Sequence, residues 1–377
     1  MEYKKLGDIA TYINGYAFKP EQRGSEGLPI IRIQDLTGNA YDLGYYNGDY
    51  PKKIELNDGD VLISWSASLG VYLWNRGKAL LNQHIFKVVF DKVEIDKFYF
   101  MYAVEYNLDK MSLKTHGATM KHITKKDFDN VVIPYPDLDY QKEVSYRLTS
   151  LKGIIEKYQK QLESLDELVK ARFVEMFGDP VENTMNWPEI LIGDKCFVTK
   201  LAGFEYTQYI DYEESGEVVM VKAQNVKNGK LNRKDLSYIS KKVSDSLPRS
   251  QLAPGDVVMT YVGANIGDVA VIDDVYKYHL APNVAKIRPN AEVYNSIYFM
   301  YMLMLLNIYI VKNSADTAKA ALGMERIRKL KVFIPPLELQ NQFASFVQEI
   351  DKSRSRIQKS LEASQELFDS LMQEYFG

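Results

Sequence analysis

The side chains that could carry out catalysis are few in this chain, and their spacing builds no recognisable active site. Four histidines are present (His84, His116, His122 and His279), and only positions 116 and 122 have even a weak metal-ligand spacing. Cys196 is the only cysteine, which excludes a thiolate cluster and a disulfide framework. The sequence also lacks a G-x-x-x-x-G-K-[ST] phosphate loop, a G-x-G-x-x-G fingerprint, an H-E-x-x-H pair and a G-x-S-x-G elbow. We therefore expect a chain without catalytic residues, metal or cofactor.

Lysine-rich stretches give the strongest binding signal. Residues Lys110–Lys126 hold five lysines and two histidines without an acid, and Lys222–Lys242 hold seven lysines and arginines against one aspartate. Arg326–Lys331 adds four more cations. Because the whole chain has a formal net charge of −3, attraction to nucleic acid would have to come from such local patches. Each run could also be an ordinary solvated surface.

Two polar turns carry side chains that can hydrogen-bond or stack on bases. They are "SWSASLG" at Ser64–Gly70 and "TYVGANIG" at Thr260–Gly267, although plain turn chemistry would look the same. Together with residues from the lysine runs and from "NQHIFKV", "APNVAKI" and "TAKAALG", they supply the candidate DNA-binding residues. These are Ser64, Trp65, Ser66, Ser68, Gln83, His84, Lys114, His116, Thr119, Lys121, Lys125, Lys222, Gln224, Asn225, Thr260, Tyr261, Asn265, Asn283 and Lys319.

An internal duplication organises the elements that must position these residues. "FYFMY" at Phe98–Tyr102 matches "IYFMY" at Ile297–Tyr301, 199 residues later, and the "FG" at 177–178 matches the "FG" at 376–377. Nearer the start, "KLGDIA" pairs with "LIGDKC" at a separation of 186. The landmarks keep their order while the loops differ in length. We infer a two-fold duplication, since a solenoid would repeat every 20–50 residues or so.

Each half is predicted to contain a mixed α/β part followed by one long helix. Prolines in "IPYPDLDYQ" and "VFIPPLELQ" end an extended segment and lead into each helix. The helices run 37 residues from glutamine to glycine, about 55 Å at 1.5 Å per residue. Apolar residues alternate in steps of four and three, which predicts a coiled-coil seam between the two helices, or packing of each helix on its own α/β part. The predicted seam is Val144, Leu148, Leu151, Ile155, Tyr158, Leu162, Leu165 and Val169 in the first helix, and Phe346, Ile350, Ile357, Leu361, Phe368 and Leu371 in the second, where Ser353 and Ser364 interrupt it.

The fold class we expect is α+β, with two α/β domains related by duplication and joined by two long antiparallel coiled-coil helices. The predicted boundaries are 1–138 for the first domain, 139–178 for the first helix, 179–188 for a linker, 189–337 for the second domain and 338–377 for the second helix.

Composition places the chain among soluble proteins. Hydrophobic residues make up 46% and charged residues 26% of the 377 positions, and the N-terminal residues lack the apolar core of a signal peptide. The single cysteine favours a reducing, cytoplasmic location. The apolar stretch Tyr294–Val311 is 18 residues long and contains Asn295, Ser296 and Asn307. It falls short of the ~20 apolar residues that cross a bilayer, so we expect a buried helix and no membrane association.

The sequence resembles the specificity subunits of type I restriction–modification enzymes over nearly its whole length. The resemblance lies in "KLGDIATYINGYAFKP", "GDVLIS…SLG", "LNQHIFKV", "GATMKHITKKDFDNVVIPYPDLDYQ" and the helix ending "EMFGDP", followed by a more divergent second copy. Two departures are visible. Trp65 and Tyr261 stand where the family often has arginine, and "TAKAALG" replaces "TMKHIT" in the second copy.

The resemblance implies a non-catalytic DNA reader. Each α/β part would be a target-recognition domain for one half of a bipartite, asymmetric sequence in double-stranded DNA, with the helices as spacer. The implied partners are two methyltransferase subunits that use S-adenosylmethionine, and restriction/translocase subunits that use ATP and Mg²⁺. An alternative from another class is a non-enzymatic coiled-coil scaffold that binds protein partners. A gel shift with random duplexes, with and without a methyltransferase partner, would separate the two.

Overall fold

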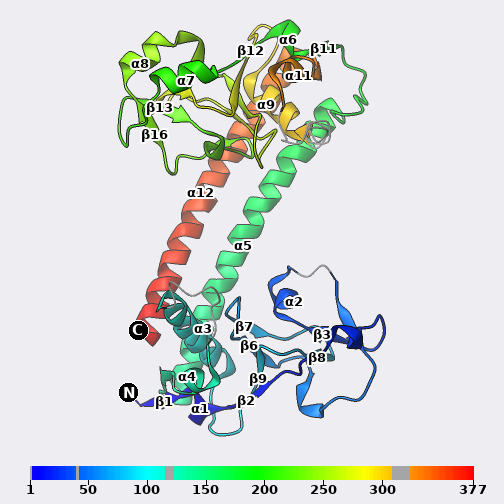
Figure 1. Cartoon of the computed structure of the whole chain (residues 1–377), viewed down its shortest axis with the longest axis vertical. Helices are drawn as coiled ribbons and strands as arrows, with labels where there is room; N and C mark the ends of the chain where they lie inside the picture. Colours follow the sequence, from blue (N-terminus) through cyan, green and yellow to red (C-terminus); the bar gives the residue numbers. More distant parts are fainter. Residues whose placement is uncertain (1, 40–41, 115–122, 308–321) are drawn as a thin grey trace. The chain divides into compact units, whose positions relative to one another are not determined.

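The chain forms two compact units, each assembled from parts of both long helices. The structure is a computed structural model that describes residues 2–39, 42–114, 123–307 and 322–377, except for the side chains at 109 and 111–114. Unit 1 comprises Met1–Gln159 with Lys359–Gly377, and unit 2 comprises Lys160–Gln358 (Figure 1). The predicted boundaries at 138 and 337 therefore fall inside these units, because the helix ends pack on the domains that they leave.

Unit 1 is a mixed α/β body whose elements are short. In chain order they are β1 (Tyr3–Lys5), α1 (Leu6–Ile9), β2 (Thr11–Asn14), the 3₁₀ turn η1 (Pro20–Gln22), β3 (Leu28–Ile31), α2 (Ile33–Thr37), β4 (Gly44–Tyr46), η2 (Lys52–Ile54), β5 (Glu55–Leu56), β6 (Val61–Ser64), β7 (Gly70–Leu73), β8 (Ala79–Leu81), β9 (Ile85–Val89), α3 (Lys97–Lys114), α4 (Lys125–Asp129) and β10 (Val132–Pro134).

Two four-stranded sheets build unit 1. The first is antiparallel throughout, in the spatial order β2-β9-β6-β7, and the second has the order β4-β3-β8-β5 with β3 and β8 parallel. Strand β6 is buried at every position, with Val61 and Ile63 in one core cluster and Leu62 in another. Alternate side chains of a strand point to opposite faces, so this strand is covered on both sides. Burial on both faces explains why apolar residues follow one another without alternation at Val61–Ile63.

Unit 2 repeats the plan with its own loops. Its elements are β11 (Glu189–Leu191), α6 (Ile192–Lys195), β12 (Cys196–Lys200), α7 (Gly203–Tyr209), β13 (Val218–Val221), η3 (Ala223–Asn225), β14 (Val226–Lys227), β15 (Lys230–Leu231), β16 (Ser237–Ile239), α8 (Lys241–Ser246), η4 (Pro248–Ser250), β17 (Gln251–Leu252), β18 (Val257–Thr260), β19 (Val269–Val271), β20 (Lys277–Leu280), β21 (Val284–Pro289), α9 (Ser296–Leu305), α11 (Met324–Arg328) and β22 (Lys331–Phe333).

The sheets of unit 2 match those of unit 1 strand for strand. The antiparallel sheet has the order β12-β21-β18-β19, and the mixed sheet has the order β16-β13-β20-β17 with β13 and β20 parallel. A two-stranded pair, β1–β10 in unit 1 and β11–β22 in unit 2, brings each domain's first strand beside its last. The duplication inferred from the sequence is thus confirmed in the topology.

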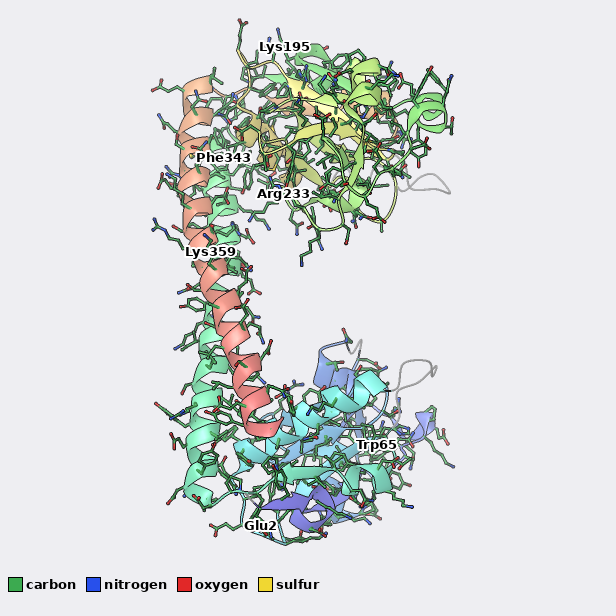
Figure 2. All side chains as sticks on the ribbon, turned by 90° about the vertical axis from the view of Figure 1, so that its left-hand side faces the viewer. Glu2, Trp65, Lys195, Arg233, Phe343 and Lys359 are labelled. Carbon is green, nitrogen blue, oxygen red and sulfur yellow. The ribbon has the colours of Figure 1, made fainter. Side chains whose placement is uncertain are left out.

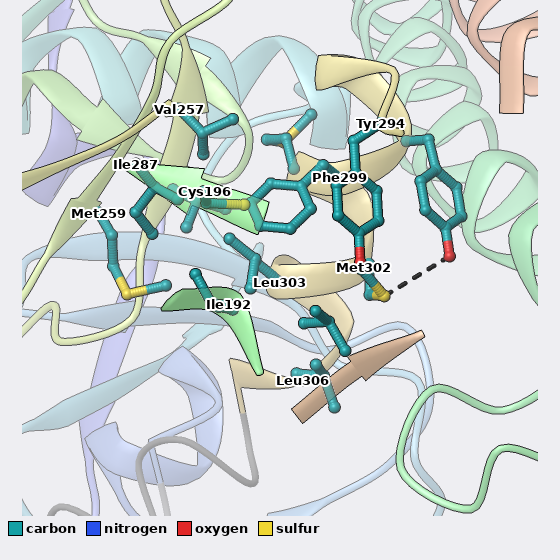
Figure 3. Packing of buried hydrophobic residues seen from close by; sticks show 14 of the residues in the cluster. Ile192, Cys196, Val257, Met259, Ile287, Tyr294, Phe299, Met302, Leu303 and Leu306 are labelled. Carbon is teal, nitrogen blue, oxygen red and sulfur yellow. Dashed lines mark hydrogen bonds between the residues drawn. The ribbon is translucent and has the colours of Figure 1, made fainter. Parts of the chain in front are cut away.

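The core between α9 and the antiparallel sheet of unit 2 contains the apolar residues of α9 and the single cysteine of the chain. Phe299 and Leu303 of α9 pack with Val257 and Ile287 of the sheet (Figure 3). Cys196 lies in the same cluster, and burial raises the pKa of its thiol to about 12. The single cysteine is therefore a core residue, not a nucleophile. Among the described residues, no helix is long and apolar enough to cross a membrane.

The two long helices are α5 (Leu138–Phe177) and α12 (Leu337–Phe376), each of 40 residues. In unit 1 the start of α5 packs on the end of α12, where the Tyr140 and Tyr375 rings lie 6.4 Å apart. In unit 2 the end of α5 packs on the start of α12, where the Phe173 and Phe343 rings lie 5.4 Å apart. The helices therefore run antiparallel, as predicted. Gly178 follows α5 with a φ of 80°, the left-handed residue that ends many helices.

A buried glutamine fixes the start of each long helix to its domain. Gln141 donates its amide to Pro136 O (2.8 Å) and accepts the backbone N–H of Asp96 (2.9 Å), which precedes α3. Gln340 does the same in unit 2, donating to Pro335 O (2.8 Å) and accepting from Asn295 N–H (2.9 Å). Both side chains are almost completely buried. The glutamine that ends each proline motif thus satisfies the N-terminus of the neighbouring helix.

The seam is buried at its ends and half-exposed in the middle. In α5, Val144, Leu148, Leu151, Ile155 and Val169 are buried, whereas Tyr158, Leu162 and Leu165 are half-buried. In α12 all six predicted seam residues (Phe346, Ile350, Ile357, Leu361, Phe368 and Leu371) are half-buried. The buried large apolar residues are Phe343, Val347, Met372, Tyr375 and Phe376, because the helix ends also contact the domain cores. Of these, Tyr375 keeps the phase of the predicted seam, whereas Val347, Met372 and Phe376 fall outside it. The heptad pattern predicts the positions at which one helix contacts the other, but not the positions at which a helix end contacts a domain core.

One predicted seam position belongs to a different residue. Ser353 is exposed, and its hydroxyl donates to Glu349 O within the helix. The half-buried neighbour is Arg354, whose side chain is 12% exposed and pairs with Asp166 of α5 at 2.6 Å. The register of the two helices in unit 2 therefore includes an inter-helix ion pair.

Candidate nucleic-acid interface

Three chain segments meet in unit 1 at the ends of β6 and β8. The N–H of Trp65 donates to His84 O (3.3 Å), and the N–H of Ile123 donates to Trp65 O (3.1 Å). We call the exposed edge formed by residues 65–69, 82–84 and Tyr16 face 1. Face 1 is thus a set of turns held by the antiparallel sheet, which is the kind of rigid support that loop-borne recognition requires.

The ring of Trp65 supports face 1 from beneath. It stacks on Phe86 with ring centroids 5.5 Å apart and meets the His84 ring edge-on at 5.0 Å. Figure 2 marks Trp65 among the side chains of unit 1. Ser64 is fully buried, and its hydroxyl donates to Ser68 O, which closes the β6–β7 turn. Trp65 and Ser64 therefore shape the turn instead of presenting a polar group to solvent. Of the predicted residues here, Ser68 and Gln83 are exposed, and Ser66 and His84 are half-buried.

Tyr16 is a face 1 residue that the sequence did not suggest. Its N–H donates to Leu81 O (2.9 Å), and its carbonyl accepts the N–H of Gln83 (3.0 Å). The side chain is 40% exposed and rests on Phe18, with ring centroids 4.9 Å apart. Gly15 permits this close approach, because a Cβ there would lie 1.9 Å from Asn82 O. An aromatic residue after a strand is usually buried in the core, so only the neighbouring Gly15 could have indicated an unusual backbone position for Tyr16.

Unit 2 builds the same frame with different side chains. The N–H of Tyr261 donates to Asn283 O (3.0 Å), and the N–H of Leu322 donates to Tyr261 O (2.8 Å). We call the edge formed by residues 261–268 and 281–283 face 2. The Lys200 ammonium lies 5.3 Å from the centre of the Tyr261 ring, a cation–π contact. Thr260 is fully buried, whereas Asn265 and Asn283 are exposed.

Left-handed backbone occurs at matching positions of both faces. His84 and Asn283 have φ values of 71° and 68°, and Ala67 and Gly263 have values of 59° and 106°. His84 and Asn283 each directly precede a strand, β9 and β21 respectively. Ala67 and Gly263 are each the third residue after the preceding strand, but five residues separate Ser64 from Gly70 whereas seven separate Thr260 from Asp268, so these two turns differ in length.

The lysine run at 222–242 does not form one patch. Lys222 donates its ammonium to Asp235 O (3.0 Å) and Ser237 Oγ (2.9 Å). Asn225 is buried and donates its amide to Asn232 O (3.0 Å) and Lys234 O (3.2 Å), which holds η3 in place. Gln224 is exposed. Arg233 pairs with Asp273. Much of this run is therefore used to fix its own loop.

Residues 227–230 and Asn232 of this run border a groove of about 1030 Å³ in unit 2. The β14–β15 hairpin, α9, α5 and α12 line it, with Lys170, Lys227 and Lys230 facing Asp166, Asp268, Asp273 and Asp351. Although Lys230 reaches solvent, surrounding burial and the nearby Arg354 lower the pKa of its ammonium. Three cations against four anions do not favour a phosphate, so the groove is not an anion site.

The first lysine run lies largely outside the described residues. That holds for the Lys114 side chain and for His116, Thr119 and Lys121, and also for Lys319 in unit 2. Lys125 is exposed at the start of α4 and pairs with Asp129 at 2.7 Å. Lys110 lies 4.3 Å from the centre of the Tyr106 ring. Within the described ranges, no group of three or more histidine, cysteine, aspartate or glutamate side chains could hold a metal ion.

The comparison with protein families identifies this architecture. Residues 1–165 and 186–365 match the type I restriction modification DNA specificity domain, which occurs once in each half. The chain belongs to this family. As a type I specificity subunit it is a recognition chain and not a catalytic one, which agrees with the main interpretation of the sequence.

Individual relatives align with this chain over most of its length. The EcoBI specificity subunit of Escherichia coli is 22% identical over 388 residues, which is 94% of this chain and 80% of the relative. The MjaVIII specificity subunit of Methanocaldococcus jannaschii is 23% identical over 390 residues, 95% of this chain and 89% of the relative.

Solved structures show the same fold at low sequence identity. The S subunit of a type I restriction–modification system from M. genitalium superposes with a TM-score of 0.59 at 14% identity, covering 100% of this chain and 96% of that one. A chain from a study of complex assembly and conformational transition of the type I R-M system gives a TM-score of 0.57 at 15% identity, covering 99% and 97%. At these sequence identities, both comparisons establish similarity of fold only.

Proposed function

We propose that this specificity subunit reads a bipartite, asymmetric site in double-stranded DNA, with face 1 and face 2 each contacting one half-site. The observation that carries this proposal is the shared backbone frame with different exposed side chains. Tyr16, Ser68 and Gln83 in face 1 have the polar and aromatic groups that contact base edges, and Asn265 and Asn283 provide amides in face 2. Unequal faces on an equal frame would read unequal sequences.

The residues proposed to touch DNA form a smaller set than the sequence predicted. The buried Ser64 and Asn225 fix turns through their side chains, Thr260 is buried at the end of its strand, and Trp65 and Tyr261 pack against the cores below. Lys125 would have to exchange its pairing with Asp129 for a phosphate oxygen, which is an inexpensive exchange because exposed ion pairs contribute only ~0–1 kcal/mol. Phosphate contacts would then depend on few cations of this chain and on its partners.

The long helices would set the distance between the half-sites. Inserting one heptad after Gln159 and another after Gln358 lengthens both helices at positions that the duplication makes equivalent. Adding seven residues keeps each apolar seam in phase. We expect a longer unread spacer in the recognition sequence, and a spacer of unchanged length would contradict the role of the helices.

Catalysis would reside on other subunits. The partners proposed are two methyltransferase subunits that use S-adenosylmethionine, and restriction/translocase subunits that use ATP and Mg²⁺, in the cytoplasm. The test is a gel shift of random duplexes followed by modified-base mapping with the methyltransferase partner present. A single asymmetric, interrupted modified sequence is expected, and Tyr16→Ala should weaken binding of the first half-site while Tyr3→Ala, an exposed tyrosine on β1, should not. Absence of any DNA binding would favour a protein-binding scaffold instead.

A further inference from the structure

The tip of the β6–β7 turn carries an alanine where the backbone favours glycine. Ala67 has a φ of 59°, in the left-handed region that L-residues enter reluctantly because Cβ approaches the following carbonyl. Glycine enters that region without this penalty. The third residue of the longer turn in unit 2 is Gly263, at a φ of 106°. Unit 1 therefore retains a methyl group at a position where unit 2 has none.

The methyl group of Ala67 is not retained for packing within the unit. Ala67 is exposed, between the half-buried Ser66 and the exposed Ser68. In the turn of unit 2, a Cβ at Gly263 would have no neighbour within 4 Å among the described residues. Because the strained Ala67 is exposed, its methyl group is open to a contact made outside the chain.

The turn holds this methyl group in a fixed place. Ser64 opposes Gly70 in the register of β6 and β7, and the Ser64 hydroxyl donates to Ser68 O across the turn. Below the turn, Trp65 is bonded through its N–H to His84 O (3.3 Å) and through its carbonyl to the N–H of Ile123 (3.1 Å). These bonds at Ser64 and Trp65 hold the base of the turn that carries Ala67. Such preorganisation lets a small group discriminate.

We propose that Ala67 is a specificity-determining residue of face 1 that contacts the 5-methyl group of a thymine in the major groove. A methyl group cannot donate or accept a hydrogen bond, and the apolar feature that the major groove offers is the thymine methyl. The neighbouring Ser66 and Ser68 hydroxyls can bond to the base edges on either side. This inference rests on the proposed function, since it assigns one contact within the first half-site.

The test combines Ala67→Gly with single replacement of each thymine in the recognised sequence by deoxyuridine, which lacks only the methyl group. With the wild-type chain and its methyltransferase partner, one deoxyuridine position in the first half-site should weaken binding about fourfold, the effect of one buried methyl group. Ala67→Gly should lose a similar factor on the thymine site and show no further loss with deoxyuridine. Its melting temperature should be unchanged or higher, because the backbone strain is relieved.

Gly263→Ala is the matched control, since it adds the same methyl group at the equivalent turn of face 2. It should leave the deoxyuridine profile of the first half-site unchanged. Equal losses of Ala67→Gly on thymine and deoxyuridine sites, or a first half-site without a T·A pair, would overturn the assignment to Ala67. Failure of the wild-type chain to bind any interrupted sequence would instead refute the proposed function.

Discussion

A chain ended after Gly178 should form a two-fold dimer. This fragment keeps the sheets of unit 1 and all of α5, but it loses the last turns of α12. Those turns place Met372, Tyr375 and Phe376 in the core cluster of unit 1, where Phe376 lies 5.2 Å from Tyr99 between ring centroids. The fragment would therefore expose an apolar surface that the intact chain covers.

The size of the lost contribution follows from the burial of these side chains. Each of the three is at most 7% exposed. Burial of one large side chain contributes ~1.5–3 kcal/mol, so the three together contribute about 5–9 kcal/mol. A whole domain is stable by only ~5–15 kcal/mol, so a monomeric fragment would be marginal or unfolded.

A second copy of the fragment can supply equivalent side chains. Phe173, Met176 and Phe177 precede Met372, Tyr375 and Phe376 by the same 199 residues that relate the two halves. In unit 2, Phe177 packs on Tyr298 with ring centroids 4.6 Å apart, as Phe376 packs on Tyr99. Each copy's α5 end would then cover the other copy's core, in an isologous interface.

Light scattering should give twice the fragment mass, and the melting temperature should rise with protein concentration. With the methyltransferase partner, the dimer should modify an inverted repeat of the first half-site. A control fragment with Phe173→Asp and Phe177→Asp should lose both the dimer and the cooperative melting transition. A folded monomer whose melting is independent of concentration would refute the reasoning.

The contributions of Gln141, Arg354 and His279 to stability can each be measured by denaturant unfolding of a substituted chain. Gln141→Leu should cost about 2–4 kcal/mol, because it removes two hydrogen bonds and leaves Asp96 N–H unpaired, whereas the exposed Gln159→Leu should cost little. Arg354→Ala should cost about 1–2 kcal/mol through its lost stem packing, and Arg354→Leu should cost less because it refills the seam; equal costs would argue against this. Burial lowers the pKa of His279 below its usual 6.5. The unfolded state therefore takes up the proton first, and stability should fall as pH drops below about 6.5, by up to ~1.4 kcal/mol per pH unit. His279→Leu should remove that part of the slope, and an unchanged slope would exclude His279 as its cause.

The duplication and the helices could be predicted because they leave long, regular marks in the sequence. The separation of 199 residues identifies Gln141 and Gln340 as equivalent, but their bonds to Asp96 and Asn295 depend on which elements the fold brings together. Heptad spacing located the seam of α5, yet it could not reveal Phe343 and Val347, which are buried by contact with a domain core.

The residues exposed on faces 1 and 2 were harder to predict, because residue type does not reveal side-chain direction at a strand end. Ser64 and Thr260 look like turn residues, but each is the last residue of a buried strand and points inward. Tyr16 looks like core and is partly exposed, because the close approach at Gly15 fixes its backbone beside Gln83. Neither outcome follows from local propensity, since both depend on the pairing of distant segments.

The assembly of unit 1 from two distant stretches has a consequence for biosynthesis. On the ribosome, unit 1 is complete only when residues 359–377 have been made, whereas unit 2 occupies the uninterrupted stretch 160–358. At a synthesis rate of ~5–20 residues per second, the 199 residues of unit 2 take about 10–40 s to emerge. During that interval the site for Tyr375 and Phe376 in the nascent first domain stays uncovered. The order of synthesis thus makes the second domain the first to be finished.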